Sequence, residues 1–112
     1  MRTISYLSTL NGRVYVYLAD PETGAAFLRK AEEEGFSFKD GEKPTARDYS
    51  RIMAVNQDKT INYVGTNGNI AFGSGTKTIG KKPLIRIDFA KYLSGSEDFY
   101  YKNFDYNSNE EL

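Results

Sequence analysis

The chain has 112 residues, 39% of them hydrophobic and 27% charged, and its 15 basic and 15 acidic side chains give a net charge of zero. This balance predicts one ordered domain over residues 1–112, without the overall field that attracts nucleic acid or anionic membranes. The sequence contains no histidine and no cysteine, which excludes imidazole acid–base chemistry, thiolate nucleophiles and structural zinc sites held by those ligands. It shows no secretory signal pattern and no apolar run long enough for a membrane span, so we expect a cytoplasmic protein.

Residues 3–19 predict a β-hairpin. Two runs of alternating apolar and polar residues flank Asn11-Gly12, the dipeptide that best tolerates the positive φ angles of a type I′ turn. A two-residue turn fixes the register of the strands, because slippage by one residue would exchange their faces. In this register three tyrosines share one face of the hairpin: Tyr6, Tyr15 and Tyr17.

Residues 21–34 predict the one clear helix. Asp20 supplies an acceptor at the N-cap, Pro21 suits the first helical position, and Gly35 ends the pattern. The glutamates at positions 32–34 crowd the last turn, where the helix macrodipole disfavours anions, so they form a second candidate acidic surface. Apolar positions at helical spacing would pack on the hairpin: Gly24, Phe27, Leu28 and Ala31.

The rest of the chain predicts further short strands. Asn67-Gly68 predicts a second tight turn between two of them. Residues 90–94 either extend the strand before them or form a turn of helix closed by Gly95, and residues 107–112 are expected to be a frayed tail. The predicted strands are residues 36–38, 52–56, 61–64, 70–72 and 84–89, with a last edge strand at 99–106.

These elements favour an α+β fold, because the strands do not alternate with helices. We expect an antiparallel, strongly twisted or partly closed sheet of six to eight short strands. One helix, at about residues 21–34, would pack on this sheet.

Motifs for catalysis are weak. Residues 75–82 match the glycine and lysine spacing of a phosphate-binding loop, but Lys82 stands where the magnesium-binding Ser or Thr belongs. A strand follows in place of the helix that such a loop must open, so a basic loop between strands is predicted. We expect a protein that is not an enzyme and that uses no metal and no cofactor. A small carboxylate-dependent hydrolase is the third hypothesis.

Tyrosines and acids are distributed as in a recognition surface. Tyrosine offers a large contact area with little rotamer entropy to lose, and carboxylates beside rings suit a partner rich in arginine and lysine. Alternatively, the C-terminal strand covers the tyrosine face and makes a second small core. The candidate partner-binding residues are Tyr6, Tyr15, Tyr17, Glu97, Asp98, Tyr100, Tyr101, Asp105 and Tyr106.

A nucleic-acid-binding accessory protein is the alternative hypothesis. Residues 76–91 contain five bases against one acid, and neighbouring aromatic residues would act as stacking platforms. The zero net charge of the whole chain disfavours this function. The candidate residues are Lys77, Lys81, Lys82, Arg86 and Lys91.

In general character the chain resembles the small accessory proteins of phages and mobile elements, which include type II anti-CRISPR inhibitors. The resemblance rests on the length, the lack of cysteine and histidine, the turns at Asn11-Gly12 and Asn67-Gly68, and the acidic, tyrosine-rich C-terminal segment. It implies a non-enzymatic inhibitor that occludes a nucleic-acid-handling host-defence machine, with a Cas9-type effector as partner. Direct nucleic-acid binding and membrane association are not expected, and the protein would be a monomer or a homodimer paired through an exposed strand.

Overall fold

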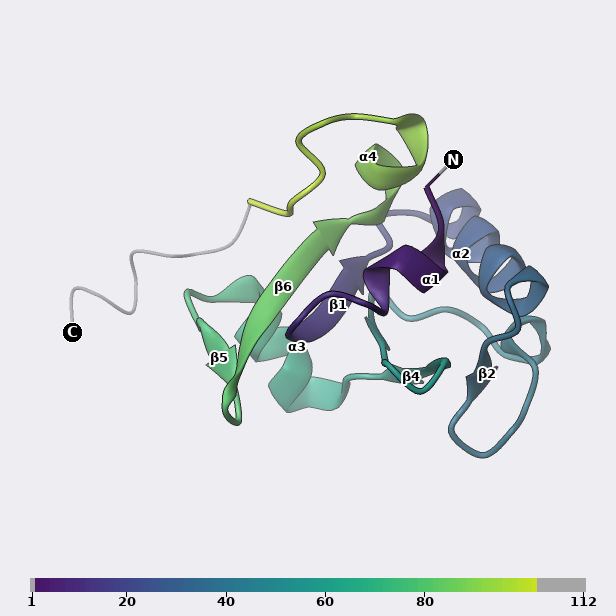
Figure 1. Cartoon of the computed structure of the whole chain (residues 1–112), viewed down its shortest axis with the longest axis horizontal. Helices are drawn as coiled ribbons and strands as arrows, with labels where there is room; N and C mark the ends of the chain where they lie inside the picture. The colour runs from purple at the N-terminus through teal and green to yellow at the C-terminus, as the bar shows by residue number, and fades with distance from the viewer. Residues whose placement is uncertain (1, 103–112) are drawn as a thin grey trace.

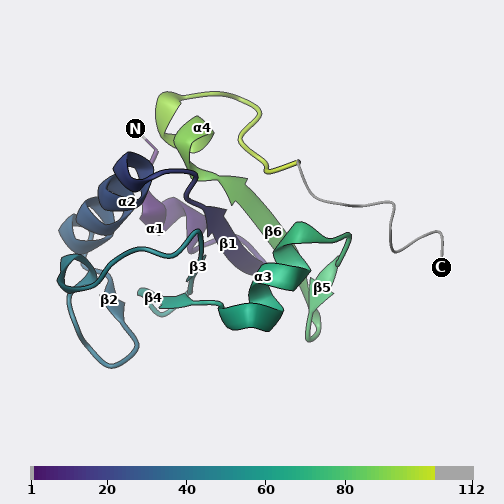
Figure 2. The same cartoon turned by 180° about the vertical axis from the view of Figure 1, so that it is seen from behind.

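A computed structural model describes residues 2–102 as an α+β fold with one open, six-stranded mixed sheet (Figures 1 and 2). The strand order is β2-β4-β3-β1-β6-β5. The strands are β1 (Arg13–Tyr17), β2 (Ser37–Phe38), β3 (Ile52–Val55), β4 (Thr60–Tyr63), β5 (Thr78–Ile79) and β6 (Lys82–Asp88). The α-helices of this part are α1 (Ile4–Leu7), α2 (Pro21–Glu33), α3 (Gly65–Gly73) and α4 (Phe89–Ser94), with one 3₁₀ turn, η1 (Pro44–Ala46).

Strand β1 is the centre of the sheet. It pairs antiparallel with β3 and parallel with β6, so that Tyr15 stands opposite both Ala54 and Arg86. Val14 and Val16 are buried in one core with residues of α1 and α2. The alternate residues, Tyr15 and Tyr17, therefore face the opposite side of the sheet, where α3 lies (Figure 2).

The sequence correctly predicts α2 and its limits. The Asp20 side chain accepts a hydrogen bond from the Thr23 backbone N–H, and the chain leaves the helix at Gly35 with a φ of 87°. The apolar stripe is buried as expected. Gly24 is required for packing as well, because a Cβ there would stand 2.2 Å from the ring of Tyr49.

The hairpin predicted over residues 3–19 is wrong. Residues 4–7 form helix α1, whose N-cap Thr3 accepts a hydrogen bond from the Tyr6 backbone N–H at 3.0 Å. The i, i+3 spacing of Ile4 and Leu7 puts both side chains in the core from a single helical turn. Both edges of β1 are occupied by strands from much later in the sequence, which displaces the local partner.

The second predicted turn, at Asn67-Gly68, is also wrong, because both residues lie inside α3. The positive φ occurs at Gly65 (71°), at the start of the helix. Gly68 serves close packing instead, since a Cβ there would meet Val64 at 2.5 Å. The predicted strand at 70–72 is therefore helical.

The later elements follow the sequence more closely. β3 and β4 form an antiparallel hairpin, β6 forms as predicted, and α4 is the turn of helix closed by Gly95, whose φ is 87°. The six strands fall within the six to eight expected. The sheet is mixed, not antiparallel as expected, and it is not closed, which rules out the partly closed form of the two that the sequence predicts. The described chain has four α-helices in place of one.

The predicted edge strand at 99–106 is present only as a single bridge between Ile87 and Tyr100, and its part from residue 103 on, like the predicted tail, lies outside the described residues. None of the helices in residues 2–102 has the length and apolar composition to cross a bilayer.

Candidate functional site

The sheet divides the tyrosines that the sequence groups together. Tyr6 lies on α1, which packs on one face of the sheet, whereas Tyr15 and Tyr17 face α3 on the other (Figures 1 and 2). The chain returns after α4 and runs antiparallel to β6, where the backbone N–H of Asp88 donates to the Phe99 carbonyl at 2.8 Å. This segment, residues 99–101, contributes aromatic rings to both sides.

One set of rings forms a closed aromatic cluster of Tyr17, Phe72 and Tyr101. The ring centre of Tyr101 lies 4.7 Å from that of Tyr17 and 4.7 Å from that of Phe72. Burial raises the pKa of the Tyr101 phenol. The sequence leaves open whether the C-terminal segment covers the tyrosine face. At Tyr17 it does so, because the Tyr101 ring packs against this half-buried side chain.

A second set forms an open aromatic patch of Arg2, Tyr6, Tyr92, Phe99 and Tyr100. Phe99 contacts the rings of Tyr92 (5.1 Å) and Tyr100 (4.9 Å), and the Arg2 guanidinium lies 4.8 Å from the centre of Phe99. Tyr6 is 54% exposed and Tyr100 48% exposed. A hollow of about 380 Å³ is lined by Arg2, Tyr6, Tyr92 and Phe99.

The open aromatic patch is held by polar contacts beneath it. The Arg2 guanidinium donates to the backbone carbonyls of Tyr92 and Ser96, and the Tyr92 hydroxyl donates to the Thr3 carbonyl at 2.6 Å. These bonds join α1, α4 and the C-terminal segment. The Tyr92 ring and the Arg2 guanidinium are consequently held in place before any partner arrives.

The acids of the C-terminal segment lie beside this patch in sequence. Glu97 and Asp98 are exposed, and Asp98 accepts a hydrogen bond from Lys102 at 2.9 Å, which lowers the pKa of its carboxyl. This ion pair partly neutralises the acidic character of the segment. The remaining two predicted partner-binding residues, Asp105 and Tyr106, lie outside the described residues.

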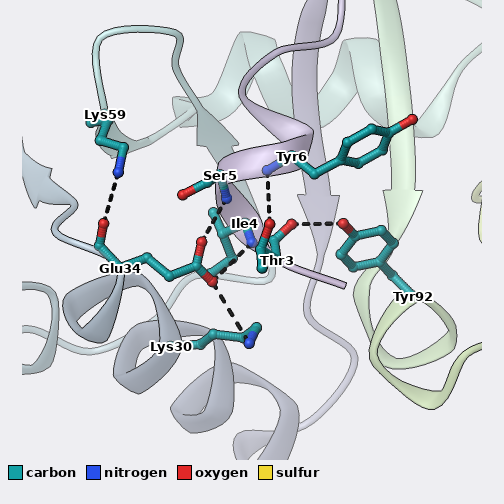
Figure 3. A network of polar contacts seen from close by, with 8 residues as sticks. All are labelled: Thr3, Ile4, Ser5, Tyr6, Lys30, Glu34, Lys59 and Tyr92. Carbon is teal, nitrogen blue, oxygen red and sulfur yellow. Dashed lines mark hydrogen bonds and ion pairs between the residues drawn. The ribbon is translucent and has the colours of Figure 1, made fainter. Parts of the chain in front are cut away.

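Two of the three glutamates at the end of α2, Glu32 and Glu34, have structural roles, whereas Glu33 is exposed. The Glu34 carboxylate accepts the backbone N–H groups of Ile4 (3.0 Å) and Ser5 (2.7 Å) and so caps α1, as Figure 3 shows. Burial of Glu34 acts to raise its pKa, but these hydrogen bonds outweigh that effect and the pKa is lowered. Glu32 accepts both the hydroxyl and the backbone N–H of Thr45.

The basic residues proposed for nucleic acid do not form one surface. Arg86 is 9% exposed, and its guanidinium donates to the backbone carbonyls at the end of α3 and just after it. Burial lowers the pKa of Arg86. Lys77, Lys81 and Lys82 lie in and around the β5–β6 hairpin, whereas Lys91 lies on α4 beyond the other end of β6 (Figure 1).

A polar pocket of about 340 Å³ lies where the start of β1 and the end of β3 meet the start of β6, and we call it the sheet pocket. The sequence identifies Tyr15 and Lys82 as site residues but not the others, because they are scattered through the chain and no motif joins them. Within residues 2–102 no group of three acidic side chains could hold a metal ion. The lining residues of the pocket are Gly12, Arg13, Val14, Tyr15, Lys39, Ala54, Val55, Asn56, Gln57, Asp58, Asn62 and Lys82.

Comparison of the chain with protein-family models, curated proteins and solved structures finds no match.

Proposed function

We propose that this protein is a non-enzymatic binding protein that occludes a surface of a partner protein through its open aromatic patch. The observation that carries the proposal is that Tyr6, 54% exposed, lines the hollow beside Phe99, and that Tyr100, 48% exposed and from the opposite end of the described chain, stacks on the same Phe99 ring. Their ring neighbours are locked by the contacts of Arg2, so little conformational entropy is left to lose on binding.

The partner surface that suits this patch is rich in arginine and lysine. Exposed tyrosine faces attract guanidinium groups, and Glu97 and Asp98 add negative charge beside them. Because Lys102 pairs with Asp98, the rings contribute more of the binding than the acids do. Basic surfaces of this kind receive phosphate in nucleic-acid-handling machines. The specific form of the proposal is therefore inhibition of a host-defence effector, as in anti-CRISPR proteins.

Direct nucleic-acid binding through residues 77–91 has less support. Arg86 is occupied by backbone carbonyls, and Lys91 lies away from the three lysines of the β5–β6 hairpin. A track for a phosphate backbone requires cations that follow one groove.

The experiment compares three tagged proteins in a nuclease-treated, high-salt capture from bacterial lysate containing a CRISPR effector: wild type, Tyr6→Ala/Tyr100→Ala, and Ile70→Ala. Ile70 is 63% exposed on α3, so its variant removes an exposed apolar side chain from the other side of the sheet. We expect the effector to be captured by the wild type and by Ile70→Ala, with at least a tenfold loss for the double variant. Binding is then measured with the purified effector.

Equal capture by all three proteins would remove the open aromatic patch from the interface. A parallel capture without nuclease completes the test: capture that occurs only in this untreated lysate, and equally for wild type and double variant, would favour the nucleic-acid hypothesis instead.

A further inference from the structure

The sheet pocket has a floor of polar side chains joined by hydrogen bonds. The Asn56 amide donates to the Thr60 hydroxyl at 3.1 Å and to the Asn62 side-chain carbonyl at 2.7 Å. Thr60 in turn donates to Asp58 at 2.5 Å, and Asn62 donates to the Tyr63 backbone carbonyl at 2.8 Å. These bonds hold amide, hydroxyl and carboxylate groups in fixed positions before a ligand is present.

The depth of the pocket comes from a small residue in the sheet. Ala54 is the register neighbour of Tyr15 on one side and of Asn62 on the other, so these three side chains share one sheet face. Phe72 of α3 and Tyr101 cover Tyr17 farther along this face, whereas the pocket lies at the opposite end of β1. A small side chain between a ring and an amide leaves room for a ligand.

The rim of the pocket is cationic. Arg13, Lys39 and Lys82 line it, and Asp58 is the one acid among the lining residues, so the local balance is positive. The ion pairs found within residues 2–102 use other cations, Lys30, Arg47 and Lys102. The pKa of the Asp58 carboxyl is lowered, chiefly by the hydrogen bond from Thr60. The positive charge of Lys39, one of the rim cations, also contributes.

We infer that the sheet pocket binds a small phosphorylated metabolite of mononucleotide size. Three cations from separate loops and strands around one hollow suit a group that carries more than one negative charge. The amides on the floor and the half-buried Tyr15 are suited to the hydrogen bonds and stacking of a sugar or base. A volume of about 340 Å³ falls at the small end of ligand sites, and the remaining bases of residues 77–91 do not line the pocket, which disfavours a polymer.

The test titrates the purified full chain at low salt with five probes: AMP, GMP, CMP, UMP and ribose 5-phosphate. Binding is measured by calorimetry and by backbone amide NMR shifts. We expect saturable one-site binding of at least one probe, tighter than that of inorganic phosphate, with shifts centred on Ala54, Asn56 and Asn62. Adenosine, which lacks the phosphate, should bind at least tenfold more weakly than AMP if AMP is a ligand.

Matched charge variants locate the site. Arg13→Gln and Lys39→Gln remove exposed rim cations and should each weaken binding at least fivefold, whereas Lys91→Gln, which removes the same charge from α4, should change it less than twofold. Saturable binding by none of the five probes would overturn the inference, as would equal weakening by Lys91→Gln. Oligonucleotides whose affinity grows with length would also overturn it, in favour of a polymer. Since this pocket is separate from the open aromatic patch, Lys39→Gln should leave partner capture unchanged.

Discussion

Tyr100 and Tyr101 are neighbours in the chain and lie in opposite environments. Tyr101 packs against both Tyr17 and Phe72 in the closed aromatic cluster, whereas Tyr100 stacks on Phe99 in the open aromatic patch and stays 48% exposed. The extended backbone of the segment directs successive side chains to opposite sides. The half-buried Tyr101 ring attaches the segment to the domain, and this attachment leaves the Tyr100 ring presented to solvent.

The largest loss of stability is expected from removing Arg86, which supports the end of α3 behind the closed aromatic cluster. Arg86→Leu removes the donors that satisfy carbonyls of Ala71, Phe72, Ser74 and Thr76, and we expect a loss of about 3 kcal/mol in the free energy of unfolding. Urea denaturation measures it. Arg86→Lys keeps the charge without the fork of donors and should recover less than half of the loss. A loss of about 0.5 kcal/mol or less for Arg86→Leu would show that water replaces the guanidinium.

Alanine substitution at the two neighbouring tyrosines sharpens the comparison directly. Tyr101→Ala removes the ring that packs against both Tyr17 and Phe72 and should cost about 2–3 kcal/mol of stability, whereas Tyr100→Ala should cost less than about 1 kcal/mol. Thermal and urea unfolding of the two variants test this order. Equal losses would contradict the division into a closed and an open side.

The smallest effect concerns the helix beneath the open aromatic patch. Glu34→Gln keeps an acceptor for α1 but loses the charge, and at pH 7 we expect a cost of about 1 kcal/mol. Because the pKa of Glu34 is lower in the folded than in the unfolded state, its contribution is complete above the unfolded pKa and is lost as pH falls through the folded pKa. The stability difference between wild type and variant should therefore shrink in acid. A difference that is constant from pH 7 to pH 3 would contradict the role of the charge.

The sequence predicted the elements that local chemistry determines. Asp20, Pro21 and Gly35 define α2 through its own caps, as predicted. Gly95 closes α4, which is one of the two forms that the sequence leaves open for residues 90–94. It failed at α1 and α3, where distant residues decide. Glu34 caps α1, and Arg86 binds the carbonyls at the end of α3, so neither Asn-Gly dipeptide forms the turn that it favours in isolation.

The candidate sites show the same limit. The interleaved rings and acids of residues 97–101 indicated a recognition segment. That this segment lies beside Tyr6 depends on the contacts of Arg2 and Tyr92, which the sequence does not reveal. Alternation along a strand placed Tyr15 and Tyr17 on one face correctly, yet Tyr6 was assigned there through a hairpin that does not form. The sheet pocket had no signal in the sequence, because Arg13, Lys39 and Lys82 meet only through strand order.

The central position of β1 has a consequence for how the chain folds. Arg13 pairs with Leu84, and Tyr17 pairs with Ile52 and Asp88, so the strand at the middle of the sheet has no partner among the residues near it in sequence. Contacts of such long range close large loops before they gain any energy, which slows folding. As the chain leaves the ribosome, β1 must wait for β3 and then for β6. A nascent chain that stops before β6 leaves one edge of the apolar strand β1 unpaired, and it is this intermediate that chaperones would recognise.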